Sequence, residues 1–300
     1  MKSLVGDWAL LVVPGVIWGA SFLFIAEGLE AVAPNGVTFT RIAIGFVTLS
    51  LFPSARQPVA RADWAGTAWL GVLWFAFPLS MFPFAEQHVS SALTGMLNGA
   101  TPLCVAAVAS LLAHRLPERG TLAGLVIGFG GAVVMALPAL GGSSSAFGVG
   151  LIMAALVSYG IALNIARPLQ QRNGAIPVVW RALGFALLLT APLGLPAVMR
   201  GNWSLRPALA MLCLGAGGTA IATILTATAA GRMGATKASA TAFLIPVVAL
   251  LLGLMIRHES VTMVSLIGAA ICLLGAAIIR NPKMFVPLLP RRFVRVGARV

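Results

Sequence analysis

SSALTGMLNGATPLCVAAVASLLAHRLPE, residues 90–118, is the most informative stretch of this chain, because a related stretch returns near the C-terminus. The second copy is GATKASATAFLIPVVALLLGLMIRHE, residues 234–259. In both, small residues lead to a proline (Pro102 and Pro246), and an apolar run then ends in Arg or His and a glutamate (Glu118 and Glu259). A glycine-bearing apolar segment follows each copy. This repetition indicates that the chain is a duplicated unit.

Composition indicates a membrane protein. The 300 residues are 59% hydrophobic and only 9% charged, and the apolar runs are too long and too many for a soluble core. None of the runs alternates polar and apolar residues as a membrane barrel strand does, so each is expected to be a helix. The expected spans are ten, at about 7–27, 37–53, 64–85, 91–112, 121–138, 147–166, 176–196, 206–230, 237–256 and 261–280.

The net charge of +13 is distributed by loop, which predicts topology and not a nucleic-acid partner. Of the 20 Lys and Arg residues, Arg41 and Arg181 fall inside spans and Arg200, Arg206 and Arg257 on one side. All the others fall on the side of the N-terminus. Because basic loops stay inside, both termini are expected in the cytoplasm.

The two copies are expected to have opposite orientations. Five spans separate equivalent positions, so Glu118 falls in an inner loop and Glu259 in an outer one. The predicted fold is an all-α membrane protein of ten transmembrane helices, built as two inverted five-helix repeats. Their expected bounds are 1–140 and 146–283, followed by a basic cytoplasmic tail at 284–300.

Inverted repeats of this kind form alternating-access carriers, with the substrate site near the membrane midplane. Helix-breaking prolines, buried amides and hydroxyls, and aromatic residues deep in the spans are therefore candidate substrate ligands. For each, packing or bonding between helices is the competing interpretation. The candidates are Trp18, Ser21, Trp74, Pro78, Asn98, Thr101, Tyr159, Asn164, Trp180, Thr241 and Pro246.

Arg41 and Arg181 form a second tier of candidates. Trp18-Gly19 precedes Arg41 much as Tyr159-Gly160 precedes Arg181, and each arginine is expected about a turn inside its span. One interpretation is an interfacial or ion-paired role, with Glu27, Glu30 or Glu86 as partners for Arg41. The other is attraction of a substrate carboxylate.

No Asp, Glu or His falls at the middle of an expected span, which favours facilitated diffusion or exchange over a built-in proton relay. An intramembrane enzyme would need a nucleophile–base or metal pair at depth, and the HExxH pattern is absent. We expect no enzyme activity, no metal and no cofactor. The three cysteines fall inside apolar runs and imply no disulfide framework.

The chain resembles the ten-span EamA type of the drug/metabolite transporter superfamily, over residues 7–280. The resemblance rests on Trp18-Gly19, on Arg41, on the block from Ala92 to Glu118, and on its inverted copy from Ala238 to Glu259. Within that type it is most similar to the YddG group of bacterial aromatic amino-acid exporters.

This resemblance implies a carrier of the bacterial inner membrane, acting as a monomer in the lipid bilayer. It would export aromatic and other apolar amino acids and similar small metabolites through a central cavity. A multidrug exporter for hydrophobic cations is the alternative. Small multidrug relatives carry a glutamate deep in the first helix, where this chain has Ser21 and Phe22.

Overall fold

The structure, a computed structural model, describes residues 2–139, 143–233 and 239–280, and every regular element in these ranges is a helix. The all-helical fold class is therefore confirmed for the part of the chain that the structure describes. The tail expected at 284–300 and residues 234–238 of the second copy lie outside the described residues.

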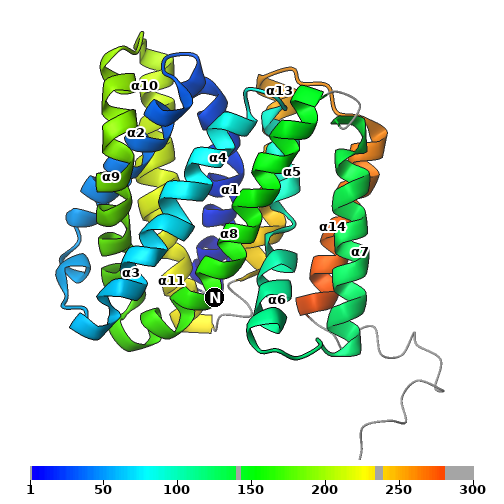
Figure 1. The fold of residues 1–300 in the computed structure, drawn as a ribbon, viewed down its shortest axis with the longest axis horizontal. Helices are drawn as coiled ribbons and strands as arrows, with labels where there is room; N and C mark the ends of the chain where they lie inside the picture. The colour runs from blue at the N-terminus through cyan, green and yellow to red at the C-terminus, as the bar shows by residue number, and fades with distance from the viewer. Residues whose placement is uncertain (1, 140–142, 234–238, 281–300) are drawn as a thin grey trace, which may run out of the picture.

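The first part of the chain is helical in each stretch that was expected to span the membrane (Figure 1). The second helix begins at Pro34, because a proline at the first helical position gives up an N–H that would have no partner there. The elements are α1 (Lys2–Leu29), α2 (Pro34–Ser50), η1 (Pro53–Arg56), η2 (Arg61–Asp63), α3 (Trp64–Leu70), η3 (Gly71–Ala76), α4 (Phe77–Ala85), α5 (Ser91–Asn98), α6 (Thr101–Leu112), α7 (Arg119–Ala136) and η4 (Leu137–Ala139).

The second part repeats this order of long and interrupted helices. A π-helical segment interrupts the third stretch of each part, as η3 and η5. The elements are α8 (Ser143–Asn173), α9 (Ala175–Met199), α10 (Leu205–Leu212), η5 (Cys213–Ile221), α11 (Ala222–Met233), η6 (Ser239–Phe243), α13 (Leu244–Ile256) and α14 (Met263–Arg280).

Within the described residues, seven helical stretches are long and apolar enough to cross a membrane. The other three expected spans, in α2, at 241–256 and in α14, are shorter helices. The seven stretches are Trp8–Leu29, Arg61–Ala85, Ser91–Leu112, Arg119–Ala139, Ser145–Asn173, Ala175–Met199 and Leu205–Ala229.

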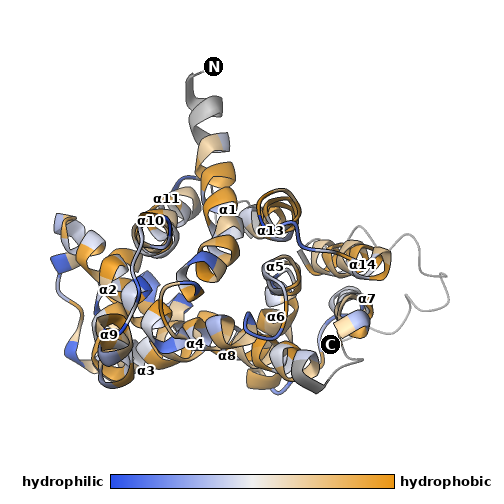
Figure 2. Cartoon of the chain, turned by 90° about the horizontal axis from the view of Figure 1, so that it is seen from above, coloured by the Kyte–Doolittle hydropathy of each residue, from blue (hydrophilic) through white to orange (hydrophobic). Residues whose placement is uncertain are grey.

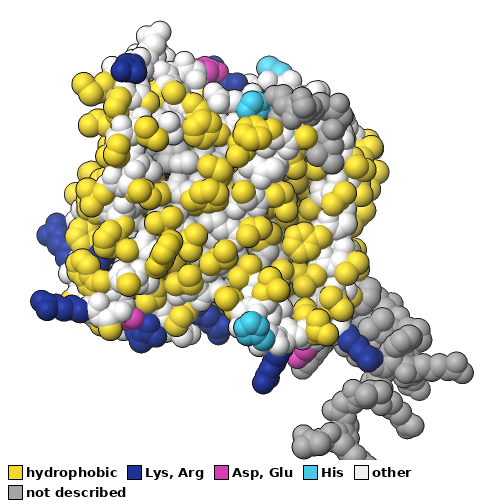
Figure 3. Space-filling model, in the orientation of Figure 1, with side chains coloured by type: hydrophobic (Ala, Val, Ile, Leu, Met, Phe, Trp, Pro, Cys, Tyr) yellow, Lys and Arg dark blue, Asp and Glu magenta, His cyan; other side chains and the backbone are white. Residues whose placement is uncertain are grey.

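The outside of the bundle is apolar, as lipid contact requires. Large apolar side chains such as Leu188, Leu193 and Met255 are exposed, at 73%, 69% and 72%. Figure 3 shows hydrophobic side chains across the whole visible face, with Lys and Arg gathered mainly along its lower edge. This surface and the seven apolar helices identify a multi-pass membrane protein.

Helices from the two parts of the chain pack against each other. Figure 2 places the α2–α9 pair at one end of the bundle and the α7–α14 pair at the other. Between them, α1 packs against α11 and α13, while α8 packs against α4 and α6. The core therefore lies where the two parts meet.

The α7–α14 pair is held by backbone contact. A Cβ added to Gly131 would lie 2.3 Å from the Cys272 nitrogen, and one added to Gly275 would lie 2.3 Å from the Gly128 Cα. No larger residue fits at either position without separating the helices. The two helix backbones therefore approach closely, as small residues at an interface permit.

Both copies of the repeated stretch are interrupted near their proline. In the first, α5 ends at Asn98 and α6 begins at Thr101, just before Pro102. In the second, the 3-10 turn η6 gives way to α13 two residues before Pro246. Each copy also has a histidine with positive φ near its C-terminal end, at 48° for His114 and 52° for His258.

Candidate functional site

Arg41 lies in the middle of α2 and is buried, at 8% exposure. Its Nε donates a hydrogen bond of 3.1 Å to Thr219 Oγ1 in η5. This is its one hydrogen bond within the described residues, so the two terminal nitrogens have no protein partner there. Arg41 was expected about one turn inside its span, but α2 begins at Pro34 and places the arginine about two turns inside the helix.

Trp18 and Ser21 face Arg41 from α1 across Gly218. Trp18 Nε1 donates to the Gly218 carbonyl at 2.8 Å. A Cβ at Gly218 would lie 2.9 Å from Ser21 Oγ and 3.8 Å from Arg41 Nη2. The missing side chain at Gly218 therefore lets α1, α2 and η5 meet around one point.

Glu86 follows the last residue of α4, and both of its carboxylate oxygens are buried without a hydrogen-bond partner in the described structure. It interacts electrostatically with Arg41, Arg257 and Glu259. Burial and the negative charge of Glu259 raise the pKa of Glu86 well above its ordinary value, while Arg257 and Arg41 partly oppose this shift. The sequence suggested Glu86 as a possible partner for Arg41 but placed it at a span end and did not include it among the candidate substrate ligands.

Aromatic rings lie beside these polar groups. Phe22 and Phe82 meet edge to face with centroids 5.6 Å apart, and Phe82 lies 5.9 Å from Tyr159. Tyr159 interacts electrostatically with Arg41, and Trp18 packs against the same core as these rings. Of the sequence candidates, the structure thus brings Trp18, Ser21, Tyr159 and Arg41 together.

Other candidates lie apart from Arg41 in contacts of their own. Asn164 donates from Nδ2 to the carbonyls of Val105 at 3.1 Å and Gly160 at 2.8 Å, so it bonds α8 to α6. Trp74 stacks on Phe75 with centroids 5.2 Å apart and packs in the core shared by α2, α3, α8 and α9.

Trp180 and Arg181 form a separate group. Trp180 stacks on Phe46 at 5.4 Å and donates to Ser50 Oγ at 2.8 Å. The Arg181 guanidinium lies 5.4 Å from the Trp180 ring, and its Nη1 donates to the carbonyls of Pro177 at 3.2 Å and Ala55 at 3.4 Å. Its charge is therefore engaged by protein groups.

The remaining candidates line the helix interruptions. Thr101 Oγ1 donates to the Asn98 carbonyl at 2.7 Å and contacts Asn98 Oδ1 at 3.3 Å, so a side chain satisfies the carbonyl at this break. Thr241 Oγ1 donates to Leu11 O at 3.0 Å and ties η6 to α1. Pro78, at the start of α4, and Pro246 are both buried.

Ion pairs close the end of the bundle where α1 ends. Glu27 is buried and accepts from Arg206 Nη2 at 2.7 Å and Arg257 Nη1 at 3.1 Å, while Glu30 pairs with Arg257. Glu27 and Glu30 therefore bind these arginines, and their expected pairing with Arg41 is wrong. Glu259 accepts from the Ser91 and Ala92 backbone nitrogens at 3.0 and 2.8 Å and caps α5.

A smaller group closes the opposite end. Asp63 accepts from Arg172 Nη2 and from Asn173 Nδ2, both at 2.6 Å, and so joins the start of α3 to the end of α8. The described structure thus has polar ties at both ends of the bundle, with Arg41 and its aromatic neighbours between them.

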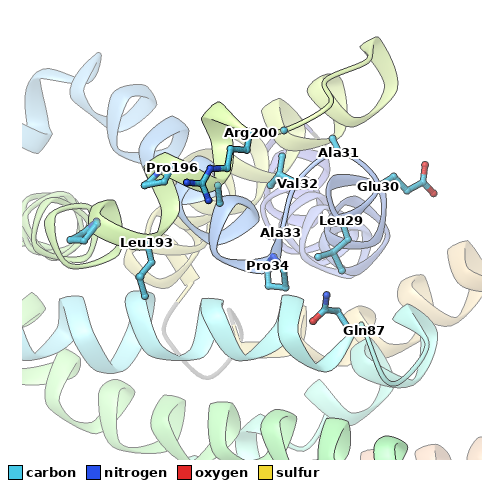
Figure 4. Close-up of a pocket in the computed structure, with 13 residues that line it drawn as sticks. Leu29, Glu30, Ala31, Val32, Ala33, Pro34, Gln87, Leu193, Pro196 and Arg200 are labelled. Carbon is cyan, nitrogen blue, oxygen red and sulfur yellow. The ribbon is translucent and has the colours of Figure 1, made fainter.

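An open cleft of about 550 Å³ lies between the α1–α2 turn and the end of α9 (Figure 4). Leu29, Pro34, Leu193 and Arg200 line it, together with Gln87, the neighbour of Glu86. In Figure 4, Gln87 and Leu193 approach the cleft from opposite sides. The described residues include no group of three or more His, Cys, Asp or Glu side chains that could hold a metal ion.

Comparison with known proteins agrees with this architecture. The model of the EamA-like transporter family matches residues 7–137 and again residues 146–281. A probable terminal-alkyne amino-acid exporter of Streptantibioticus cattleyicolor is 25% identical, over 94% of this chain and 95% of its own length. A chloroplastic WAT1-related protein of Arabidopsis thaliana is 22% identical, over 92% of this chain and 70% of its own length.

A crystal structure with 20% sequence identity aligns with a TM-score of 0.60, covering 92% of this chain and 96% of the other. That likeness concerns the fold alone. Because the family model matches almost the whole chain, in two consecutive stretches, the chain belongs to the EamA-like transporter family.

Proposed function

We propose that this chain is a secondary carrier of the bacterial inner membrane that exports amino acids with aromatic or other apolar side chains, together with similar small metabolites. The observation that carries the proposal is the buried Arg41 guanidinium, whose terminal nitrogens have no partner among the described residues. An unpaired buried cation is costly, and a substrate carboxylate would offset that cost. The neighbouring rings of Phe22, Phe82 and Tyr159 would contact an apolar side chain.

The same observation separates this proposal from export of hydrophobic cations. A buried arginine repels a cationic substrate, whereas it attracts a carboxylate. The amino-acid exporter of Streptantibioticus cattleyicolor is a relative whose substrate class agrees with this preference.

The proposed topology has ten crossings in two inverted repeats, with a single chain sufficient for transport. Reciprocal packing supports it: the first span packs on the eighth and ninth, as α1 on α11 and α13, and the sixth packs on the third and fourth, as α8 on α4 and α6. A pseudo-twofold axis that relates the two halves would produce such reciprocal helix contacts.

Both termini would lie in the cytoplasm. Basic side chains gather near the end of the bundle where α1 begins (Figures 1 and 3), and the positive-inside rule assigns that end to the cytoplasm. Transport would follow alternating access by facilitated diffusion, because no Asp, Glu or His lies at the middle of a described helix.

The test is uptake of labelled tryptophan, phenylalanine, threonine and methionine into liposomes holding the purified protein, with and without a proton gradient. We expect saturable uptake of the apolar amino acids that the gradient does not change. Uptake of tetraphenylphosphonium with no amino-acid uptake would refute the proposal in favour of a cation exporter. Gradient-dependent amino-acid uptake would retain the substrate class and refute facilitated diffusion.

A further inference from the structure

Two buried groups of opposite charge, Arg41 and Glu86, interact electrostatically without bonding to each other in the described structure. Arg41, from α2, has terminal nitrogens with no partner in the described structure, and Glu86, after α4, has two buried oxygens with none. They interact electrostatically, but the described residues include no hydrogen bond or ion pair between them. Buried charges without a direct partner are costly, so an arrangement that keeps these two groups apart is not one that favours stability.

Their neighbours hold the two groups in place. Thr219 accepts from Arg41 Nε, which orients the guanidinium and leaves its outer edge free. Glu86 is held at the C-terminal end of α4, where its backbone nitrogen donates to the Phe82 carbonyl at 2.9 Å. Arg257 contributes attraction and Glu259 repulsion at the Glu86 carboxylate, but both are engaged elsewhere, with Glu27 and Glu30 and with the start of α5.

We propose that Arg41 and Glu86 are the two poles of a site for the zwitterionic head of an α-amino acid, with the carboxylate on Arg41 and the ammonium on Glu86. The inference rests on the proposed function and assigns its recognition chemistry. Guanidinium and carboxylate groups match these two ends of the ligand, because charge-assisted hydrogen bonds are the stronger ones. Phe22, Phe82 and Tyr159, which contact one another through Phe82, would contact the side chain of the amino acid.

The site would select against ligands that have only one of the two charges. A ligand without an ammonium leaves the Glu86 oxygens unpartnered, and one without a carboxylate leaves the Arg41 terminal nitrogens unpartnered. Buried polar groups without partners cost affinity, so discrimination comes from the protein groups left unsatisfied.

The experiment compares three ligands that share a phenyl ring: phenylalanine, 3-phenylpropanoate and 2-phenylethylamine. Their affinities are measured by calorimetry with the full chain in detergent, for the wild type, Glu86→Gln and Glu118→Gln. Glu118 is an exposed glutamate and serves as the matched control. We expect the wild type to bind phenylalanine roughly tenfold or more tightly than either analogue.

In Glu86→Gln we expect the phenylalanine affinity to fall roughly tenfold and the 3-phenylpropanoate affinity to stay unchanged, whereas Glu118→Gln resembles the wild type. Equal binding of phenylalanine and 3-phenylpropanoate by the wild type would overturn the assignment, even if Glu86→Gln did not fold. Phenylalanine binding unaffected by Glu86→Gln would overturn it too and leave the amino-acid function intact. If the wild type bound none of the three ligands, the proposed function itself would fail.

Discussion

Arg41 and Arg181 follow similar motifs in the two halves of the chain, yet their surroundings differ. Each lies about two turns inside its helix, α2 or α9. Arg181 is half-buried, donates to two backbone carbonyls and lies against Trp180. Arg41 is buried, and only its Nε has a hydrogen-bond partner in the described structure. Similar motifs in the two halves therefore place an arginine at a similar depth but in different hydrogen-bonding surroundings.

The difference arises from the elements that face each arginine. Arg41 faces η5, where the bare backbone of Gly218 leaves room for the guanidinium and Thr219 supplies one acceptor. Arg181 faces η1, whose Ala55 carbonyl accepts from it directly. The terminal nitrogens of Arg41 therefore remain available for the proposed ligand, whereas Arg181 donates to backbone carbonyls of the fold.

The largest effect is expected from replacing the two arginines in turn. Arg41→Met removes the proposed carboxylate partner, so the affinity for phenylalanine should fall about 10- to 100-fold, as expected for loss of a charged hydrogen bond. Arg181→Met should change this affinity by less than about twofold, because a contact away from the ligand is lost. Calorimetry on both variants measures the contrast. Equal losses of phenylalanine affinity in the two variants would show that the two arginines contribute equally to binding.

The second prediction concerns pH, because Glu86 is a buried acid beside Arg41, whereas the described contacts of Arg181 include no carboxylate. The pKa of Glu86 is raised, so this carboxyl takes up a proton at a higher pH than an exposed glutamate does. A neutral carboxyl attracts an ammonium less. The affinity for phenylalanine should therefore fall as the pH is lowered through this raised pKa, and the affinity for 3-phenylpropanoate should not fall with it.

The charged groups that shift the pKa of Glu86 are Glu259, Arg257 and Arg41. An exposed glutamate has no such combination of charges around it and is therefore not a suitable control for the pH dependence. The control is Glu86→Gln, in which this fall of phenylalanine affinity between neutral and acidic pH should disappear. A fall of the same size in Glu86→Gln would assign the pH dependence to another group.

A smaller effect is expected from the acceptor that orients Arg41. Thr219→Val keeps the shape of the side chain and removes the hydroxyl, so Arg41 Nε loses its partner. The cost should be about 1 kcal/mol, or about fivefold in phenylalanine affinity. Thr228→Val, at an exposed threonine of α11, is the control and should have no effect. An unchanged affinity in Thr219→Val would show that Arg41 does not need this contact.

The smallest effect on transport is expected from the two asparagines, which also differ between the halves. Asn164 bonds α8 to α6, so Asn164→Leu should lower the free energy of unfolding by about 1–3 kcal/mol. The Asn98 amide nitrogen has no hydrogen bond in the described structure, so Asn98→Leu should reduce transport and leave the thermal stability unchanged. Stability losses of similar size in both variants would contradict this distinction.

The sequence predicted the helices well, because long apolar runs and prolines act locally. The interruption just before Pro102 follows from such a signal. The depth of Arg41 was missed because the expected span began at residue 37, although Pro34 is a favourable first residue of a helix.

The sequence suggested Glu86 as a possible partner for Arg41, but it could not show that this carboxylate is buried. Glu86 follows an apolar helix, which is typical of an exposed residue at a membrane interface. Its burial depends on tertiary packing, and the charges that act on it come from Arg41 and from Arg257 and Glu259, far away in the sequence. The contacts of Asn164 and Trp180 likewise depend on which helices become neighbours.

The most direct test is uptake of labelled phenylalanine into liposomes that contain equal amounts of the wild type, Arg41→Met or Arg181→Met. Because Arg41 is proposed to bind the substrate carboxylate and Arg181 to serve the fold, we predict that Arg41→Met abolishes saturable uptake and that Arg181→Met retains it. Full uptake by a correctly folded Arg41→Met protein would contradict the account.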